Sequence, residues 1–478
     1  NPSSASNSKT RGEVFERLIQ QGLQPTDINV RTKQGQEQQR IFPGVMVSYK
    51  GREIPLNLLA DQLGAPPEAI INNSIQALEY NFTNTIRKLS NSNRPKIAFT
   101  YGHGELSLIE TADIRYALSD YYTVERVKIT GNVNALTSRK ANNDGSFSIV
   151  NKYRAIVIAQ PDSVFTEKDK FIIDQFVMQG GKVLWLIDPV FATMDSLQQA
   201  TQTMGITQDI NLNDQLYKYG VRLNSNLLMD INALPIPMVT GHMGNQPQFS
   251  FFPWYYFPVL TASSSHPVVN HLNAIRTEFI SSIDTVGDPA IRKTILLTTS
   301  QYTRIALTPV MISLDLLSKD PNPEEYNQPP QPVAVLLEGE FESLFKNRLT
   351  SEISEAPELG FTEKVKNNRM IVISDGDIIK NQLRMNEGSL IPLPLGYDRH
   401  TGQTFGNRDF ILNCVNYLCD DEGLMSVRSR ELRLRALDVT KARNQLLTWQ
   451  LINILGPVLL VVLFGIVQFA IRKRKYAR

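Results

Sequence analysis

The C-terminal residues constrain this chain more than any other feature of its sequence. Leu446 to Ile471 is an almost uninterrupted apolar run without a charged residue, and Arg472, Lys473, Arg474 and Lys475 follow it directly. A helix needs about 20 predominantly apolar residues to cross a hydrocarbon core about 30 Å thick, so this run is long enough to cross with some tilt. The sequence therefore predicts a transmembrane helix at 446–471 and a basic cytoplasmic tail at 472–478.

The charges beside this run predict its orientation. The tail carries only basic charges, whereas the juxtamembrane segment at 426–445 mixes both signs. Because Lys and Arg are retained preferentially on the cytoplasmic side, we expect the tail inside and the bulk of the chain outside. In a Gram-negative bacterium this means an inner-membrane protein with its bulk in the periplasm. Export of such a bulk needs a leading segment, so we expect an N-terminal span or signal to be missing from the sequence.

The predicted span contains several residues that are not aliphatic. Asn453, Pro457 and Gln468 interrupt an otherwise aliphatic helix. Polar residues in lipid usually face a neighbouring helix, so Asn453 and Gln468 indicate either a partner interface or the depth of the headgroups. The predicted membrane anchor consists of Trp449, Asn453, Pro457, Gln468, Arg472, Lys473, Arg474 and Lys475.

Composition limits the remaining possibilities. A chain of 478 residues is expected to form two or three domains. With 49 basic and 47 acidic residues and a net charge of +2, it shows no bias toward polyanions, which argues against nucleic acid as a partner. Cys414 and Cys419 lie five apart, one inside a helical run at 409–418 and one directly after it, so we interpret them as small core residues rather than a disulfide or metal pair.

The pattern of apolar residues predicts an α/β architecture. Residues 1–94 indicate a small N-terminal α/β subdomain, with helices at 11–21 and 67–89 and two strands within 41–59. Strands are then predicted at 96–100, 123–129, 155–159 and 182–187, alternating with helices at 105–119 and 167–178. This alternation is typical of βαβ units and a largely parallel sheet covered on both faces, here within a domain at 95–425. Two more strands, at 333–337 and 370–374, complete the sheet after an insertion at about 190–332 that ends in a Pro-rich loop.

Motifs for catalysis are mostly missing from the sequence. No glycine-rich loop ends in Gly-Lys-Ser/Thr, and no Ser or Cys occupies a sharp strand-to-helix turn. Of the five histidines only His266 and His271 have zinc-ligand spacing, and no Glu or Cys ligand accompanies them in register. The sequence thus predicts no enzyme, no metal and no cofactor. The turn Tyr101-Gly102-His103-Gly104-Glu105 follows a strand, where backbone N–H groups can meet an anion. It is either a tight strand-to-helix turn or a ligand site at His103 and Glu105.

A dense aromatic cluster occupies residues 245–258. Trp254, Tyr255 and Tyr256 lie at its centre. Flat amphipathic rings bury much area at small entropic cost, so an exposed cluster would suit a sugar or a peptide. The other interpretation is an interdomain core. We keep Trp254, Tyr255 and Tyr256, together with His103 and Glu105, as candidate contacts for a ligand or a partner.

Several short motifs, in this order along the chain, resemble one known family. They are Ile41-Phe42-Pro43-Gly44, Ala77-Leu78-Glu79-Tyr80, Thr100-Tyr101-Gly102-His103-Gly104-Glu105, Pro253-Trp254-Tyr255-Tyr256, Leu337-Glu338-Gly339-Glu340-Phe341, Pro394-Leu395-Gly396-Tyr397-Asp398, Gly406-Asn407-Arg408-Asp409-Phe410 and the segment from Arg430 to Lys475. Together they resemble GldG, the auxiliary, substrate-binding-protein-like subunit family of the gliding-motility ABC transporter of Bacteroidetes.

The resemblance implies a fold and a set of partners. It implies a flavodoxin-like or GATase-like sheet of the non-enzymatic GIFT type. It also implies two partners, a permease resembling GldF and a cytoplasmic ATPase resembling GldA. The leading hypothesis is therefore a non-catalytic, membrane-anchored auxiliary subunit that couples an extracytoplasmic domain to the permease and ATPase. The alternative is an extracytoplasmic module of the transporter that binds a saccharide or a peptide.

Overall fold

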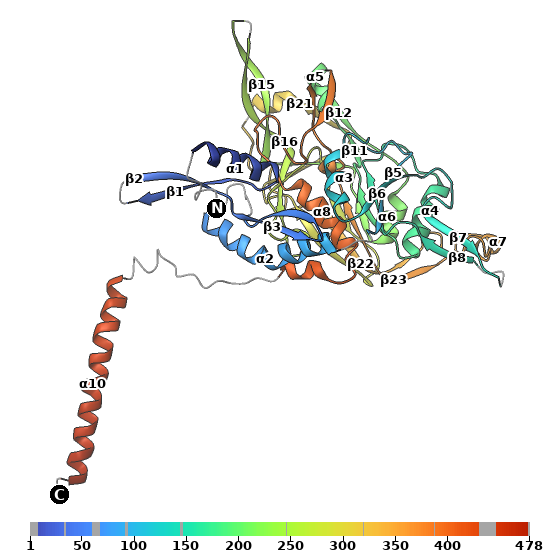
Figure 1. The fold of residues 1–478 in the computed structure, drawn as a ribbon. Helices are drawn as coiled ribbons and strands as arrows, with labels where there is room; N and C mark the ends of the chain where they lie inside the picture. Colours follow the sequence, from blue (N-terminus) through green and yellow to red (C-terminus); the bar gives the residue numbers. More distant parts are fainter. Residues whose placement is uncertain are drawn as a thin grey trace. The chain divides into compact units, whose positions relative to one another are not determined.

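The computed structural model describes residues 8–32, 35–59, 67–90, 94–143, 147–244, 246–318, 320–386, 388–429 and 446–476. The chain divides into two compact units, Asn1–Arg430 and Glu431–Arg478 (Figure 1). The predicted domain boundaries at residues 94, 425 and 445 stay predictions. Most of the predicted juxtamembrane segment, residues 430–445, lies outside the described residues.

The N-terminal region of the first unit contains two helices and two hairpins. Its elements are α1 (Ser8–Gln20), β1 (Thr26–Thr32), β2 (Gly35–Ile41), β3 (Gly44–Tyr49), β4 (Arg52–Asn57) and α2 (Pro67–Ser90). The two predicted helices and the β3–β4 hairpin are confirmed. The β1–β2 hairpin was not predicted, because Gly35–Ile41 is almost wholly polar and carries no alternating apolar signal.

A single large sheet organises the rest of this unit. Its strands, in spatial order, are β15 (Ala233–Met243), β16 (Gln246–Ala262), β19 (Ile291–Thr298), β22 (Pro332–Glu342), β23 (Lys364–Ile373), β10 (Lys182–Leu186), β9 (Ala155–Ala159), β5 (Lys96–Tyr101) and β6 (Thr123–Lys128), and β17 (Ile275–Arg276) pairs with β16. Strands β23, β10, β9, β5 and β6 run parallel to one another. The pairs from β15 to β23 are antiparallel.

Smaller elements surround the sheet. They are α3 (Ala112–Ser119), β7 (Thr137–Ala141), β8 (Phe147–Asn151), α4 (Glu167–Met178), β11 (Val190–Phe191), α5 (Met194–Gln199), β12 (Gln202–Thr207), α6 (Asn213–Tyr219), β13 (Val221–Leu223), β14 (Asn226–Asp230), β18 (Ile283–Thr285), β20 (Thr303–Leu307), β21 (Val310–Ser313), η2 (Leu314–Ser318), α7 (Ser351–Ser354), η3 (Asp377–Ile379), β24 (Leu383–Asn386), β25 (Ser389–Pro392), α8 (Asn407–Leu418) and η4 (Leu424–Ser429).

The central strands are buried on both faces, and their side chains alternate between two cores. In β10, Leu184 and Leu186 belong to one core and Val183 and Trp185 to the other. This division follows from the period of two along a strand. It explains why the central strands are continuous apolar runs rather than alternating ones.

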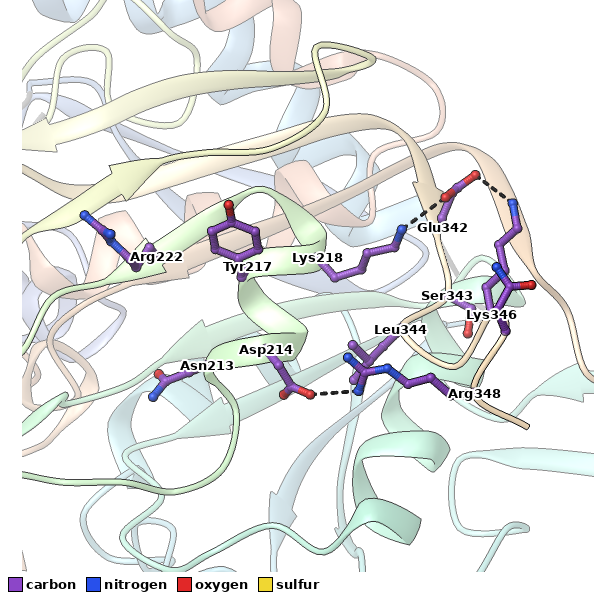
Figure 2. Close-up of a pocket in the computed structure, with 11 residues that line it drawn as sticks. Asn213, Asp214, Tyr217, Lys218, Arg222, Glu342, Ser343, Leu344, Lys346 and Arg348 are labelled. Carbon is purple, nitrogen blue, oxygen red and sulfur yellow. Dashed lines mark hydrogen bonds and ion pairs between the residues drawn. The ribbon is translucent and has the colours of Figure 1, made fainter. Parts of the chain in front are cut away.

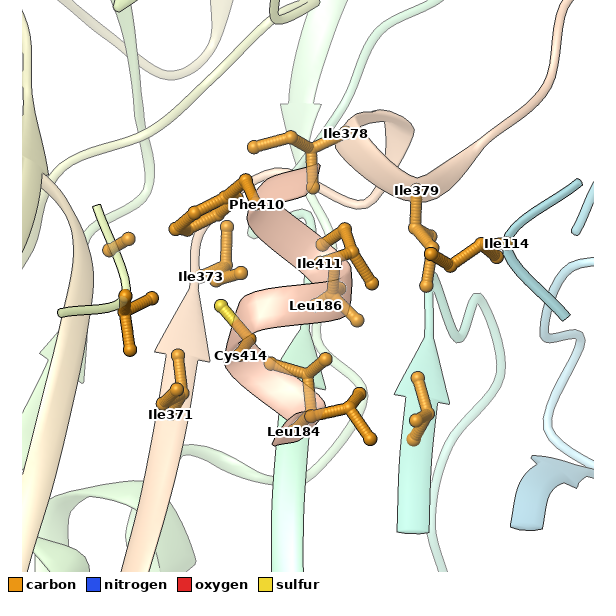
Figure 3. Packing of buried hydrophobic residues seen from close by; sticks show 14 of the residues in the cluster. Ile114, Leu184, Leu186, Ile371, Ile373, Ile378, Ile379, Phe410, Ile411 and Cys414 are labelled. Atoms are coloured by element: carbon orange, nitrogen blue, oxygen red, sulfur yellow. The ribbon is translucent and has the colours of Figure 1, made fainter. Parts of the chain in front are cut away.

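Helices cover both faces of the sheet. Helices α3 and α8 contribute Ile114, Phe410 and Cys414 to the first core, where α8 lies over β10 and β23 (Figure 3). Helices α4 and α6 contribute Phe176 and Tyr219 to the second core. Both cysteines are free and buried, and burial raises the pKa of the Cys414 thiol well above its usual value. The interpretation of the cysteines as core residues is confirmed.

The prediction of a largely parallel sheet was wrong for half of its extent. The predicted strands at 333–337 and 370–374 do join the sheet, but β22 and β23 pair antiparallel. An apolar run indicates burial and carries no information about direction. Direction depends on the connection, and only a crossover returns the chain parallel.

The helix predicted at 105–119 begins later, at Ala112. Glu105 is held in the preceding loop, where its carboxylate accepts hydrogen bonds from Thr100 Oγ1 at 2.9 Å and from the backbone N–H of His103 at 2.7 Å. These contacts use the carboxylate to close the turn after β5. The apolar spacing could not show this, because it is a polar interaction.

The second unit contains the helix α10 (Leu446–Tyr476). By length and composition, Gln450–Lys475 could cross a membrane. Its apolar side chains are exposed within the unit, for example Leu460 and Val461 at 71%. A candidate C-terminal membrane helix is thus present, as the sequence predicts.

Asp174 on α4 joins three parts of the second core. Its carboxylate accepts hydrogen bonds from Tyr219 Oη on α6 at 2.9 Å, from Ser343 Oγ at 2.6 Å and from the Leu344 N–H at 2.9 Å. Burial raises the pKa of Asp174 even though these donors oppose the change. The residue therefore holds α4, α6 and the loop after β22 together.

We expect Asp174→Ala to lower the free energy of unfolding by about 3–5 kcal/mol, because it leaves several buried donors without an acceptor. Urea denaturation of the full chain in detergent measures this change. Asp320→Ala, at an exposed position, is the matched control and should change it by less than about 0.5 kcal/mol. Equal effects of the two substitutions would contradict the assignment.

Candidate functional site

The loops after four parallel strands meet at one edge of the sheet. Because β5, β9, β10 and β23 are parallel, their carboxyl ends share this edge, which is where open α/β sheets commonly bind ligands. A cavity of about 410 Å³ lies there. We call it the carboxylate cavity; its lining includes Glu105, Glu110, Gln160, Asp188, Glu278, Asp377 and Lys380.

Close packing of the loops fixes the shape of this cavity. Gly104 has φ of +75°, which favours glycine, and a Cβ atom there would lie 1.6 Å from Asp162 Oδ1 in the loop after β9, so another residue would be strained and would displace the Asp162 side chain. Asp188 Oδ1 accepts a hydrogen bond from the Gly376 N–H at 2.5 Å, and its Oδ2 accepts one from Gln160 Nε2 at 2.7 Å. The loops after β9, β10 and β23 are thereby joined through one carboxylate.

The carboxyl groups here are close enough to disturb one another. Burial, with a further contribution from Asp377, raises the pKa of Asp188 to about 7. Burial, together with the charges of Asp188 and Asp377, raises the pKa of Asp375 well above its usual value. Burial also raises the pKa of Glu278, against the lowering effect of Arg276. In all three carboxyl groups, burial therefore favours the protonated form.

Two cations balance part of this negative charge. Lys380 Nζ donates to Asp377 Oδ1 at 3.1 Å, and Arg276 forms an ion pair with Glu278. Burial would lower the pKa of Lys380, but Asp377, Glu110 and Glu278 together raise it above its usual value. The carboxylates outnumber the cations, so the cavity favours ligands rich in hydrogen-bond donors.

A second cavity, of about 700 Å³, adjoins the first and shares Met194, Asp195 and Glu278 with it. We call it the hairpin cavity, because residues 234–239 of β15 line one side of it. Leu197, Phe257 and Leu314 add apolar surface, and Arg276, Asp398 and His400 add polar groups. Apolar walls with a few convergent polar groups are typical of binding sites.

A third hollow, of about 660 Å³, lies beside α6 and the loop after β22, at the other edge of the parallel strands. Figure 2 shows Lys218 and Lys346 directed at Glu342, and Arg348 at Asp214, with distances of 3.0 Å for all three pairs. Hydrogen bonds from Lys364, Lys218 and Lys346 lower the pKa of Glu342 to about 2. Its charges already satisfy one another, so we do not consider it the candidate site.

His103 and Glu105 fall on different sides of the cavity wall. Glu105 lines the carboxylate cavity. His103 is buried behind it, where its Nε2 lies 3.2 Å from Asp169 Oδ2 and its ring stacks on Phe165 at 3.8 Å. Nothing in these contacts identifies a ligand, so both assignments stay predictions.

Trp254, Tyr255 and Tyr256 are buried, with exposed fractions of 0%, 7% and 4%. They pack in a third core with Phe257 and Phe279. Of the two interpretations of these aromatic residues, an exposed platform or a core, the structure shows a core. Their role as contacts for a ligand or partner stays a prediction.

The predicted anchor residues lie on α10. Asn453, Pro457, Gln468 and the basic residues 472–475 are exposed within the second unit, while the side chain of Trp449 lies outside the described part of the chain. The exposure agrees with an apolar helix that needs a membrane or another protein around it. The role of each residue stays a prediction.

Sequence reasoning missed Asp188, Asp377, Glu278 and Lys380. Two of them were accessible to it. Asp188 directly follows the strand predicted at 182–187, Asp377 lies three residues after the one predicted at 370–374, and carboxyl ends of parallel strands share an edge. Glu278 comes from a loop after β17, far from these strands in sequence. Only the tertiary structure brings it to the cavity.

The carboxylate cavity is lined mainly by hydrogen-bond acceptors. Its described lining contains Ser107, which donates to Glu110 Oε2 at 2.6 Å, and no histidine or cysteine. Within the described ranges, no three His, Cys, Asp or Glu side chains are arranged to hold a metal ion. The arrangement can accept hydrogen bonds from hydroxyl or ammonium groups and can exchange protons near neutral pH.

A family model described as an ABC-type uncharacterized transport system matches residues 94–414. The chain belongs to this family of transport-system auxiliary components. The matched residues include the parallel strands and all the loops around the carboxylate cavity. Membership implies that the chain works with other parts of a transporter.

Other comparisons add little. No curated protein matches the chain. A solved structure titled "mmIFT52 N-terminal domain" is 10% identical over 68% of this chain and 99% of its own, with a TM-score of 0.36. A similarity at this level bears on neither fold nor function.

The raised pKa of Asp188 predicts a pH-dependent stability. A carboxyl group whose pKa rises on folding binds more protons in the folded state, so its contribution is complete below about pH 4 and is lost as the pH rises through about 7. The amide in Asp188→Asn cannot ionise, so the free energy of unfolding of this variant should fall less as the pH rises. We expect the difference from wild type to be on the order of 1–3 kcal/mol. Urea denaturation between pH 4.5 and 7.5 measures both profiles.

Asp214→Asn serves as the control for sign. Burial would raise the pKa of Asp214, but Lys170 and Arg348 lower it below its usual value. This substitution should therefore cost stability at neutral pH and cost little in acid. Parallel profiles for wild type and Asp188→Asn would show that Asp188 does not titrate as stated.

Proposed function

We propose that this chain is a non-catalytic, membrane-anchored auxiliary subunit of an ABC transport complex linked to gliding motility. The family match over residues 94–414 is the observation that supports the auxiliary role, and α10 supplies a candidate anchor. The link to gliding motility rests on the resemblance of the sequence motifs to GldG. In this proposal α10 crosses the bacterial inner membrane and the first unit lies in the periplasm. The partners are a permease resembling GldF and a cytoplasmic ATPase resembling GldA.

The membrane helix would receive the motion of the permease. Asn453 and Gln468 would hydrogen-bond to permease helices, because polar side chains in lipid need such partners. Pro457 would bend the helix between them, and Arg472 to Lys475 would remain in the cytoplasm. Trp449 would lie at the outer interface.

We expect Asn453→Leu with Gln468→Leu to weaken retention of the permease while leaving the helix in the membrane. An interhelical hydrogen bond is worth about 0.6 kcal/mol on average, so the loss is roughly threefold per residue. The readout is co-purification of permease and ATPase with the tagged full chain in mild detergent. Val462→Leu, which changes an apolar residue of the same helix, is the control. Asn453→Leu with Gln468→Leu should also slow gliding of the cells.

If the wild-type chain elutes alone while all three subunits are present in the membrane, the proposed function is wrong. Retention that is unchanged in the double variant would remove only the role of these two side chains. The two outcomes can be told apart, because the first is measured on the wild-type chain and the second on the double variant.

A second candidate function is capture of a saccharide or peptide. The carboxylate cavity favours it, since Glu105, Asp188 and Asp377 present acceptors at the edge where parallel sheets bind ligands. Glu105 would contact the ligand and His103 would hold its loop in place. Trp254, Tyr255 and Tyr256 would support the wall from behind.

For any saccharide or peptide that binds the wild-type chain, we expect Asp377→Asn to weaken binding at least fivefold. A neutral amide accepts hydrogen bonds from hydroxyl and ammonium groups less strongly than a carboxylate does. Calorimetry with a panel of oligosaccharides and short peptides is the measurement. Asp214→Asn, in the hollow at the other edge, is the matched control. No heat of binding from any member of the panel would argue for the auxiliary role alone.

A further inference from the structure

From Pro235 to Val239, one face of the β15–β16 hairpin consists of apolar residues. The register pairs Pro235 with Pro253, Pro237 with Phe251, and Val239 with Phe249. Opposite residues in an antiparallel pair share a face, as do alternate residues along each strand. We call this set the hairpin face: Pro235, Pro237, Val239, Phe249, Phe251 and Pro253.

The hairpin face is open to solvent at its outer end. Val239, Phe249 and Phe251 are exposed by 52%, 54% and 52%. The hairpin projects from the body of the first unit (Figure 1). Contiguous exposed aromatics on a rigid strand pair are unusual for a surface that only meets water, and they mark interaction sites.

The hairpin also lacks charge. No Asp, Glu, Lys or Arg occurs between Asp230 and Arg276. The β1–β2 hairpin of the same chain is different, since Asp27 and Arg40 form an ion pair across it. Depletion of charge with enrichment of aromatics is the composition of an interface core.

The free edge of β15 is a poor site for strand addition at its inner end. Pro235 and Pro253 are opposite each other, and two prolines cannot exchange N–H···O=C bonds, so this is a non-hydrogen-bonded pair. The backbone groups of Pro235 and Pro237 therefore point to the free edge, where neither offers an N–H. Prolines of this kind protect an edge, which favours the face of the hairpin as the surface for a partner.

The hairpin face continues into the hairpin cavity. Pro235, Pro237 and Val239 line this cavity together with Leu234, Ile236 and Met238 of the opposite face of β15. Leu197, Phe257 and Leu314 complete its apolar wall and pack in the core that contains Leu234 and Ile236. A cavity of about 700 Å³ is large enough for one or more side chains of a partner. Anchors that enter such pockets usually supply most of the binding energy of an interface.

The extent of this surface indicates which partner it fits. Independent stable interfaces bury about 1,200–2,000 Å² and use roughly 20–30 residues a side. A face of six residues with one cavity is smaller, so it suits a partner that is already held nearby. Tethering by α10 in the same membrane would supply the missing affinity as effective concentration.

We propose that the hairpin face and hairpin cavity dock onto an uncharged, apolar surface on the outer side of the transport complex's membrane-spanning subunit. The partner surface should be uncharged because the hairpin face is uncharged. A charged partner surface would lose its hydration against this face without gaining an ion pair. An anionic lipid surface is disfavoured, since the hairpin offers no Lys or Arg to it. The inference rests on the proposed function.

Photocrosslinking in cells tests the contact directly. With p-benzoylphenylalanine in place of Phe249 or Phe251, in the full chain expressed with its permease and ATPase, we expect an adduct with the permease. The same probe at Leu307 or Tyr116, each 73% exposed elsewhere on the unit, should give none. An adduct with a second copy of the chain, or with lipid only, would overturn the docking proposal.

A double variant tests the energetic role. Phe249→Ser with Phe251→Ser should reduce retained permease at least tenfold in mild detergent, while thermal unfolding stays unchanged because both rings are exposed. Leu307→Ser is the matched control. If wild type and variant retain the permease equally, this inference fails and the proposed function stands. If the wild type retains none, both fail.

Discussion

The rest of the structure depends on the burial of the central parallel strands between two layers of helices. Every residue of β9 and β10 is buried, and alternate side chains enter opposite cores. Because β5, β9, β10 and β23 are parallel, the loops that follow them share one edge. The carboxylate cavity exists because those loops carry acids there, and its raised pKa values follow from the same desolvation.

The first unit separates two kinds of surface. Asp188, Asp377 and Glu278 form a polar cavity whose charge depends on pH, whereas the hairpin face is apolar and uncharged. The two meet at the hairpin cavity, which shares Glu278 with the carboxylate cavity. A partner on the hairpin would therefore lie next to the cavity.

Sequence patterns predicted the elements best where burial alone decides them. Helix α4 matches its predicted range, and β5, β9 and β10 match within one residue, because apolar runs and flanking glycines report burial and chain ends. Sequence patterns predicted the structure less well where a polar contact decides the conformation. Glu105 was assigned to a helix, yet its carboxylate closes a loop. Of the candidate site, Glu105 was named, whereas the rest of the cavity lining was not.

By itself, the sequence determined that the chain has an α/β core and an apolar helix able to cross a membrane, since both follow from local periodicity and run length. Only the tertiary structure decided the direction of β22, the meeting of Glu278 with Asp188, and the burial of Trp254 beside the exposure of Phe249. These depend on contacts between residues far apart in the chain. Local spacing has no access to such contacts, because which segments meet is set by packing of the whole unit.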